Sequence, residues 1–110
     1  MTNPAPVVSF EPVKYAACAL PVGHPDYADY VIRVIFRPRH GQWAIFHAGP
    51  QGGDGGRYLS TDGSWSREEH LFDLDTARAL AMDAAVTVAV PAHGRTAADV
   101  LAADKWKVVR

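Results

Sequence analysis

The clearest alternation of apolar and polar positions lies in residues 30–38, YVIRVIFRP. Because successive side chains of a strand point to opposite faces, one face of such a strand would be wholly apolar: Tyr30, Ile32, Val34 and Phe36. The other face mixes apolar side chains with arginines, as in a sheet with one side in the core. Residues 37–42 predict a turn in which Gly41 takes a positive φ, and residues 43–48 predict the returning strand of a hairpin.

Shorter segments predict a second hairpin and two further strands. Residues 57–60 and 64–66 flank Asp62-Gly63, a pair that is typical of a tight turn with positive φ. Residues 7–11 predict a strand, and residues 21–29 a loop. Residues 13–20 are compatible with strand or helix, and we favour a strand because prolines bracket the segment.

Two helices are expected in the second half of the chain. Residues 71–85 have a stripe of small and apolar positions, and Asp73 is suited to cap the helix: Leu74, Ala77, Ala81, Ala84 and Ala85. Residues 86–90 fit either a final strand or a helix end. Residues 95–106 predict a second helix, capped by Thr96 with Asp99 three residues later in place of the usual Glu.

Strands followed by helices predict an α+β fold: a small antiparallel β-sheet built of β-hairpins, with one or two helices packed on one face. The 110 residues suggest a single domain, residues 1–110, with a flexible lead-in at residues 1–6.

Charge and cysteine content narrow the classes of partner. The net charge of -1 argues against nucleic acid as the main partner, although Arg33, Arg37 and Arg39 leave that reading open as an alternative. Cys18 is the single cysteine, so no internal disulfide can form. No apolar run is long enough for a transmembrane helix and the first residues lack a secretory signal, so we expect a cytoplasmic protein without membrane contact.

No motif in the chain indicates catalysis, a metal or a cofactor. The glycine-rich residues 49–57 lack the Gly-Lys-Ser/Thr of a phosphate-binding loop, and the five histidines lack the spacing of zinc ligands. We therefore predict no catalytic residue, no metal site and no cofactor. The alternative is a small enzyme or ligand-binding domain, with a pocket between the glycine-rich loop and the hairpin. That pocket would bring His47 or His70 beside Ser60 or Cys18.

The aromatic residues suit either the core of a small sheet or a contact surface, since aromatics are enriched at interface hot spots. The candidate residues for partner contact are Trp43, His47, Arg57, Tyr58 and Trp65. The resulting expectation is a non-enzymatic binding or accessory protein that acts by protein–protein contact, with a protein partner or as a homodimer.

A set of positions between residues 30 and 103 resembles small uncharacterised proteins of phages and actinobacteria. These proteins have a YLS-x-x-G-x-W hairpin followed by an F-x-L-x-x-A helix, matched here by Tyr30, Val31, Ile32, Tyr58, Leu59, Ser60, Gly63, Trp65, Phe72, Leu74 and Ala77. Residues 37–56 depart from that pattern as a long insertion. The resemblance implies a fold and a phage or actinobacterial origin, and it implies no activity.

Overall fold

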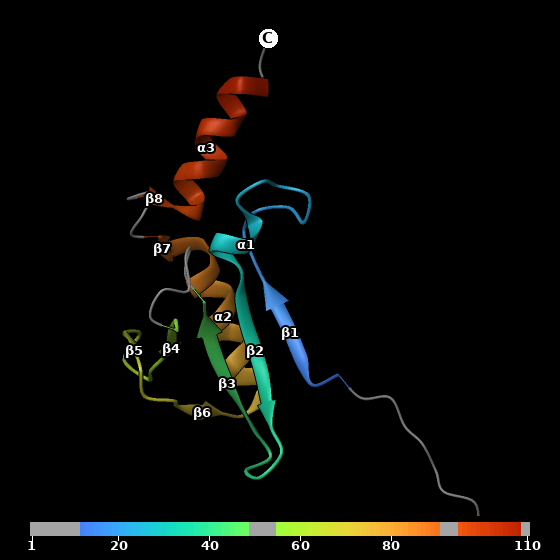
Figure 1. Ribbon diagram of the computed structural model, residues 1–110, viewed down its shortest axis with the longest axis vertical. Helices are drawn as coiled ribbons and strands as arrows, with labels where there is room; N and C mark the ends of the chain where they lie inside the picture. The colour runs from blue at the N-terminus through green and yellow to red at the C-terminus, as the bar shows by residue number, and fades with distance from the viewer. Residues whose placement is uncertain (1–11, 49–54, 91–94, 109–110) are drawn as a thin grey trace, which may run out of the picture.

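The computed structural model describes residues 12–48, 55–90 and 95–108, with side chains up to residue 103. Its elements follow one another as β1 (Lys14–Ala17), α1 (Tyr27–Tyr30), β2 (Ile32–Arg37), β3 (Gln42–His47), β4 (Arg57–Leu59), β5 (Trp65–Ser66), β6 (Leu71–Phe72), α2 (Leu74–Thr87), β7 (Ala89–Val90), β8 (Arg95–Thr96) and α3 (Ala97–Val108). The main sheet is antiparallel in the order β1-β2-β3-β4-β5, and β6 pairs with β3. Helix α2 lies along one face of this sheet (Figure 1). The predicted α+β fold is confirmed.

The β2–β3 hairpin forms as the alternation predicts. Val34 pairs with Ile45, and the loop of residues 38–41 closes with the Gly41 amide donating to the Arg37 carbonyl at 3.0 Å. Gly41 has a φ of 63°, in the left-handed region that favours glycine. The strand begins at Ile32, so the prediction that Tyr30 belongs to it is wrong.

Tyr30 instead ends the short helix α1, and residues 27–29 of this helix lie in the segment 21–29 that was predicted to be a loop. The Val31 amide donates to the Tyr27 carbonyl at 3.0 Å and closes this turn. The Tyr30 side chain is fully buried, and its hydroxyl donates to the Arg95 carbonyl at 3.0 Å. A contact with a residue so distant in the sequence leaves no trace in the local pattern, which explains the error.

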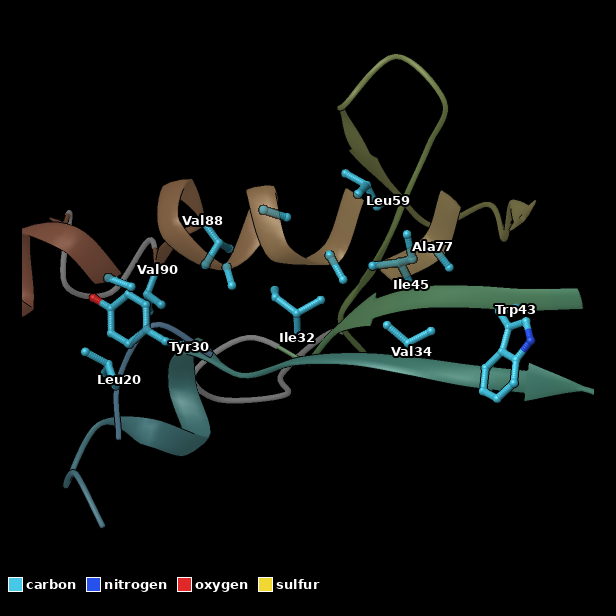
Figure 2. Packing of buried hydrophobic residues seen from close by; sticks show 14 of the residues in the cluster. Leu20, Tyr30, Ile32, Val34, Trp43, Ile45, Leu59, Ala77, Val88 and Val90 are labelled. Atoms are coloured by element: carbon cyan, nitrogen blue, oxygen red, sulfur yellow. The ribbon is translucent and has the colours of Figure 1, made fainter. Parts of the chain in front are cut away.

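Helix α2 packs its alanines on the sheet. Ile32, Val34 and Ile45 point toward this helix (Figure 2), and its buried positions are Ala77, Ala81, Ala84 and Ala85. The predicted cap is confirmed, because the Asp73 carboxylate accepts from the Thr76 amide at 2.8 Å. The helix begins at Leu74 rather than at residue 71, since residues 71–72 pair with β3 as β6.

Three further expectations have a clear outcome. The favoured strand within residues 13–20 is confirmed at Lys14–Ala17. Residues 86–90 contain both predicted alternatives, since α2 extends to Thr87 and β7 follows it. At the start of α3 the Asp99 amide donates to Thr96 Oγ1 at 3.2 Å, and the Thr96 amide donates to the Asp99 carboxylate at 3.1 Å. This reciprocal pair is a capping box formed with Asp.

The β4–β5 hairpin forms around the turn predicted between residues 57–60 and 64–66. The Ser60 amide donates to the Ser64 carbonyl at 2.9 Å, so the loop spans residues 61–63. Gly63 has a φ of 86°, while Asp62 keeps a negative φ. Three-residue loops with a left-handed glycine are a common hairpin connection. The predicted strand at residues 7–11, the lead-in at residues 1–6 and most of the glycine-rich loop lie outside the described residues.

Candidate protein-contact surface

The face of the sheet opposite α2 is built from alternate residues of its strands. Residues that pair across antiparallel strands share a face, and Val34 and Ile45 define the side that α2 covers. Their neighbours in the strands therefore point the other way. We call this side the open face, made of Lys14, Ala16, Arg33, Ile35, Arg37, Gln42, Ala44, Phe46, Tyr58, Ser66 and Leu71.

The centre of the open face is apolar and aromatic. The rings of Phe46 and Tyr58 pack with centroids 5.0 Å apart, and both side chains remain half-buried. Ile35 and Leu71 flank Ala44 across the sheet and are also half-buried. In Figure 1, β2 and β3 lie in front of α2, and no helix of the described residues covers them from the other side.

Gly56 fixes the position of the Phe46 ring. It has a φ of 76°, and a Cβ added there would lie 2.6 Å from Phe46 Cζ and 2.7 Å from the His47 carbonyl oxygen. The backbone that enters β4 can lie this close to Phe46 only because residue 56 has no side chain. The aromatic pair is therefore held in place by the chain that precedes Tyr58.

Basic side chains border the aromatic centre. Arg37 donates from Nε to the Glu69 carboxylate at 2.9 Å and from Nη2 to the Tyr58 hydroxyl at 3.3 Å. Its Nη2 also lies 2.7 Å from Glu69 Oε2, and this hydrogen-bonded carboxylate raises the pKa of Arg37. Arg33 pairs with Phe46 across the strands and is half-buried. Arg37 thus holds the Tyr58 hydroxyl, while Arg33 adds a second positive charge.

The structure does not gather the five residues predicted for partner contact on one surface. Tyr58 lies on the open face, while Trp43, His47 and Trp65 lie on the side of the sheet that α2 covers. Trp43 and His47 are each 8 % exposed. Arg57 pairs with His47 and donates from Nη1 to the Gly56 carbonyl at 2.8 Å.

His47 has a structural contact in this fold. Its Nε2 donates to the Asp29 carbonyl at 2.7 Å, and its ring centroid lies 5.7 Å from that of Trp65. This bond joins the end of β3 to α1. The bond requires a proton on Nε2, because a carbonyl oxygen can only accept.

The groups considered for nucleophilic chemistry have other partners. Ser60 Oγ donates toward Asp62 Oδ1 at 2.6 Å and lies 2.7 Å from Ser64 Oγ, so it belongs to the hairpin loop. Burial raises the pKa of the Cys18 thiol, which lowers the fraction of reactive thiolate, and its Sγ is 4.0 Å from the Tyr27 carbonyl oxygen. Residues 49–54, the other wall of the alternative pocket, lie outside the described residues.

The alternation that predicts the hairpin also places Ile35 on the open face. Of the aromatic pair on this face, Tyr58 was among the predicted contact residues and Phe46 was not. Ile35 and Phe46 lie next to Val34 and Ile45 in their strands, so their side chains point to the face that α2 does not cover. Pairing of β3 with both β4 and β6 then brings Tyr58 and Leu71 beside them. No local pattern predicts this second set of pairings, because β4 and β6 contain three and two residues.

Among the described residues, no three His, Cys, Asp or Glu side chains are grouped as metal ligands. In the same part of the chain, none of the helices has the length and apolar character needed to cross a bilayer. No family model, no curated protein and no solved structure matches this chain.

Proposed function

We propose that this protein is a non-enzymatic binding protein that contacts another protein through the open face. The observation that carries the proposal is the half-buried cluster of Ile35, Phe46, Tyr58 and Leu71 on a sheet face that no described helix covers. Apolar surface that is bordered by polar groups can mark a protein–protein interaction site. Tyr and Arg are also the residue types that contribute most often to interface hot spots.

The charges of the open face indicate the chemistry of the partner. Lys14, Arg33 and Arg37 are its charged members, and Glu69 neutralises Arg37 from the side. Two copies stacked through this face would bring like charges together, which is unfavourable. The partner we propose is therefore a different protein, with apolar side chains flanked by carboxylates.

The test is a pair of charge reversals. Arg33→Glu changes the open face, while Arg78→Glu makes the same change at an exposed position of α2. Each variant and the original protein are used as bait in extracts of native cells, and retained proteins are quantified by mass spectrometry. A retained partner is then purified and its affinity measured directly.

The proposal predicts a protein that the original chain and Arg78→Glu both retain and that Arg33→Glu loses, with affinity lower by roughly tenfold or more. Equal retention by both variants would place the contact elsewhere and overturn the proposal. Salt-sensitive retention on DNA that Arg33→Glu abolishes would also overturn it, in favour of the nucleic-acid alternative.

A further inference from the structure

The two edges of the main sheet differ. At one edge β5 has two residues, so it offers little backbone to a further strand. At the other edge β1 has four residues, its side chains are mostly exposed and it contains no proline. Edge strands of this kind can pair with another strand unless they are covered.

One backbone hydrogen bond determines which backbone groups of β1 point toward β2 and which point away from it. The Phe36 amide donates to the Val13 carbonyl at 2.9 Å, so Val13 and Phe36 form a hydrogen-bonded pair. Such pairs recur at every second residue of an antiparallel ladder, so Tyr15 and Ala17 also bond toward β2. The amide and carbonyl groups of Lys14 and Ala16 therefore point away from the sheet.

We infer that β1 pairs with β1 of a second copy, in an antiparallel arrangement about a twofold axis at Tyr15. In this register Lys14 of each copy exchanges both backbone hydrogen bonds with Ala16 of the other, which gives about four bonds. The main sheets of the two copies then form one continuous sheet across the interface. The inference does not depend on the proposed use of the open face.

The same register covers apolar side chains that one copy leaves exposed. Val13 is 58 % exposed and Tyr15 37 % exposed. Tyr15 of one copy lies opposite Tyr15 of the other, and Val13 lies opposite Ala17. Cross-strand aromatic and apolar pairs of this kind stabilise antiparallel sheets.

Among the described residues, β2 is the strand that pairs with β1, and Val13, just before β1, is bonded to β2 as well. Residues 1–7 contain Pro4 and Pro6, which have no amide to donate to a ladder. Residues 49–54 connect β3 to β4, and β3 is separated from β1 by β2.

The interface is short, so we expect a weak dimer that depends on protein concentration. Lys14 lies on the open face near the axis, and its counterpart in the other copy repels it. Added salt should therefore strengthen the dimer, because it screens that repulsion.

Sedimentation velocity from micromolar to millimolar protein tests the inference, together with amide hydrogen exchange. The dimer should appear as the protein concentration rises. The Lys14 and Ala16 amides should become protected from hydrogen exchange over the same concentration range. The Tyr15 and Ala17 amides should be protected at every concentration. Ala16→Pro removes an outward amide without removing a bond to β2, and it should abolish the dimer, whereas Ala16→Thr should keep it.

A chain that stays monomeric throughout this range would overturn the inference. A dimer in which the Lys14 and Ala16 amides stay unprotected would also overturn it, because the copies would then join elsewhere. Urea unfolding of Ala16→Pro shows whether the variant is folded. Arg33→Glu should leave the dimer intact, which distinguishes failure of this inference from failure of the proposed partner binding.

Discussion

At the scale of single residues, two adjacent glycines show how the backbone supports the open face. Gly55 and Gly56 both have positive φ, at 87° and 76°. A Cβ on Gly55 would meet nothing within 4 Å, whereas a Cβ on Gly56 would collide with Phe46 and with the His47 carbonyl. The two positions have similar backbone strain and differ in the space around them.

Replacing each of these glycines by alanine should separate the two effects. Gly55→Ala should lower the free energy of unfolding by about 1 kcal/mol, the cost of a left-handed residue with a side chain. Gly56→Ala should cost roughly 2 kcal/mol more, because the Phe46 ring must also move. Urea unfolding measures both values. Equal losses for the two variants would contradict the close approach of Gly56 to Phe46.

The Asp62 carboxylate predicts a pH dependence of stability. Hydrogen bonds from Ser60 and then Ser64 hold the pKa of Asp62 well below its ordinary value of 3.8. A lowered folded-state pKa contributes stability above that ordinary value, and the contribution is lost as pH falls through the folded-state pKa. Asp62→Asn keeps an acceptor without the charge.

The original chain should therefore be more stable than Asp62→Asn at neutral pH, and the difference should shrink in acid. Unfolding by urea across this pH range measures the difference. Asp73→Asn serves as a comparison, since the Thr76 amide lowers the pKa of Asp73 in the same direction at a separate site. A difference for Asp62→Asn that is constant with pH would contradict the hydrogen-bonded loop.

Among the elements, long periodic segments and short strands beside prolines or a turn signal could be predicted from the sequence, whereas elements that depend on distant contacts could not. The β2–β3 hairpin and α2 follow from the alternation in residues 30–37 and the alanine stripe after Asp73. Helix α1 and strand β6 depend on contacts with distant residues, Arg95 for the first and β3 for the second. Such contacts decide short elements because local propensity over two to four residues is weak.

The alanine stripe of α2 predicts that a larger side chain destabilises the protein on the face of this helix that packs against the sheet. Ala81 is 1 % exposed against the sheet, while Ala79 is exposed on the same helix. Ala81→Leu should cost about 1–3 kcal/mol of unfolding free energy through overpacking, and Ala79→Leu should change it little. Thermal or urea unfolding of the pair is the measurement. A well-tolerated Ala81→Leu would mean that α2 lies farther from the sheet.

At the scale of the whole molecule, Tyr30 links the main sheet to the small β7–β8 sheet. Its hydroxyl bonds to the Arg95 carbonyl while its ring lies in the core. Tyr30→Phe removes the hydroxyl and should lower the free energy of unfolding by about 1 kcal/mol. Hydrogen exchange should show faster opening near Arg95. Unchanged stability and unchanged exchange would contradict this link.

The candidate site could be predicted less well than the fold. Aromatic content indicates that side chains are available for contact, but the face on which each lies depends on strand register. Trp43 and His47 fall on the side covered by α2, and Tyr58 falls on the open face, although all three are in strands. Glu69 neutralises the charge of Arg37 because the fold brings these two residues together, although they are 32 residues apart in the sequence.

Side-chain labelling by hydroxyl radicals, in native cells and in the purified protein, tests whether a protein partner covers the open face. Phe46 and Tyr58 report on the open face, and Met82, which is 65 % exposed on α2, reports on the opposite side of the molecule. A protein partner on the open face predicts that Phe46 and Tyr58 are protected in cells while Met82 is labelled equally in both samples. Equal labelling of Phe46 and Tyr58 in cells and in the purified protein would mean that no partner covers the open face.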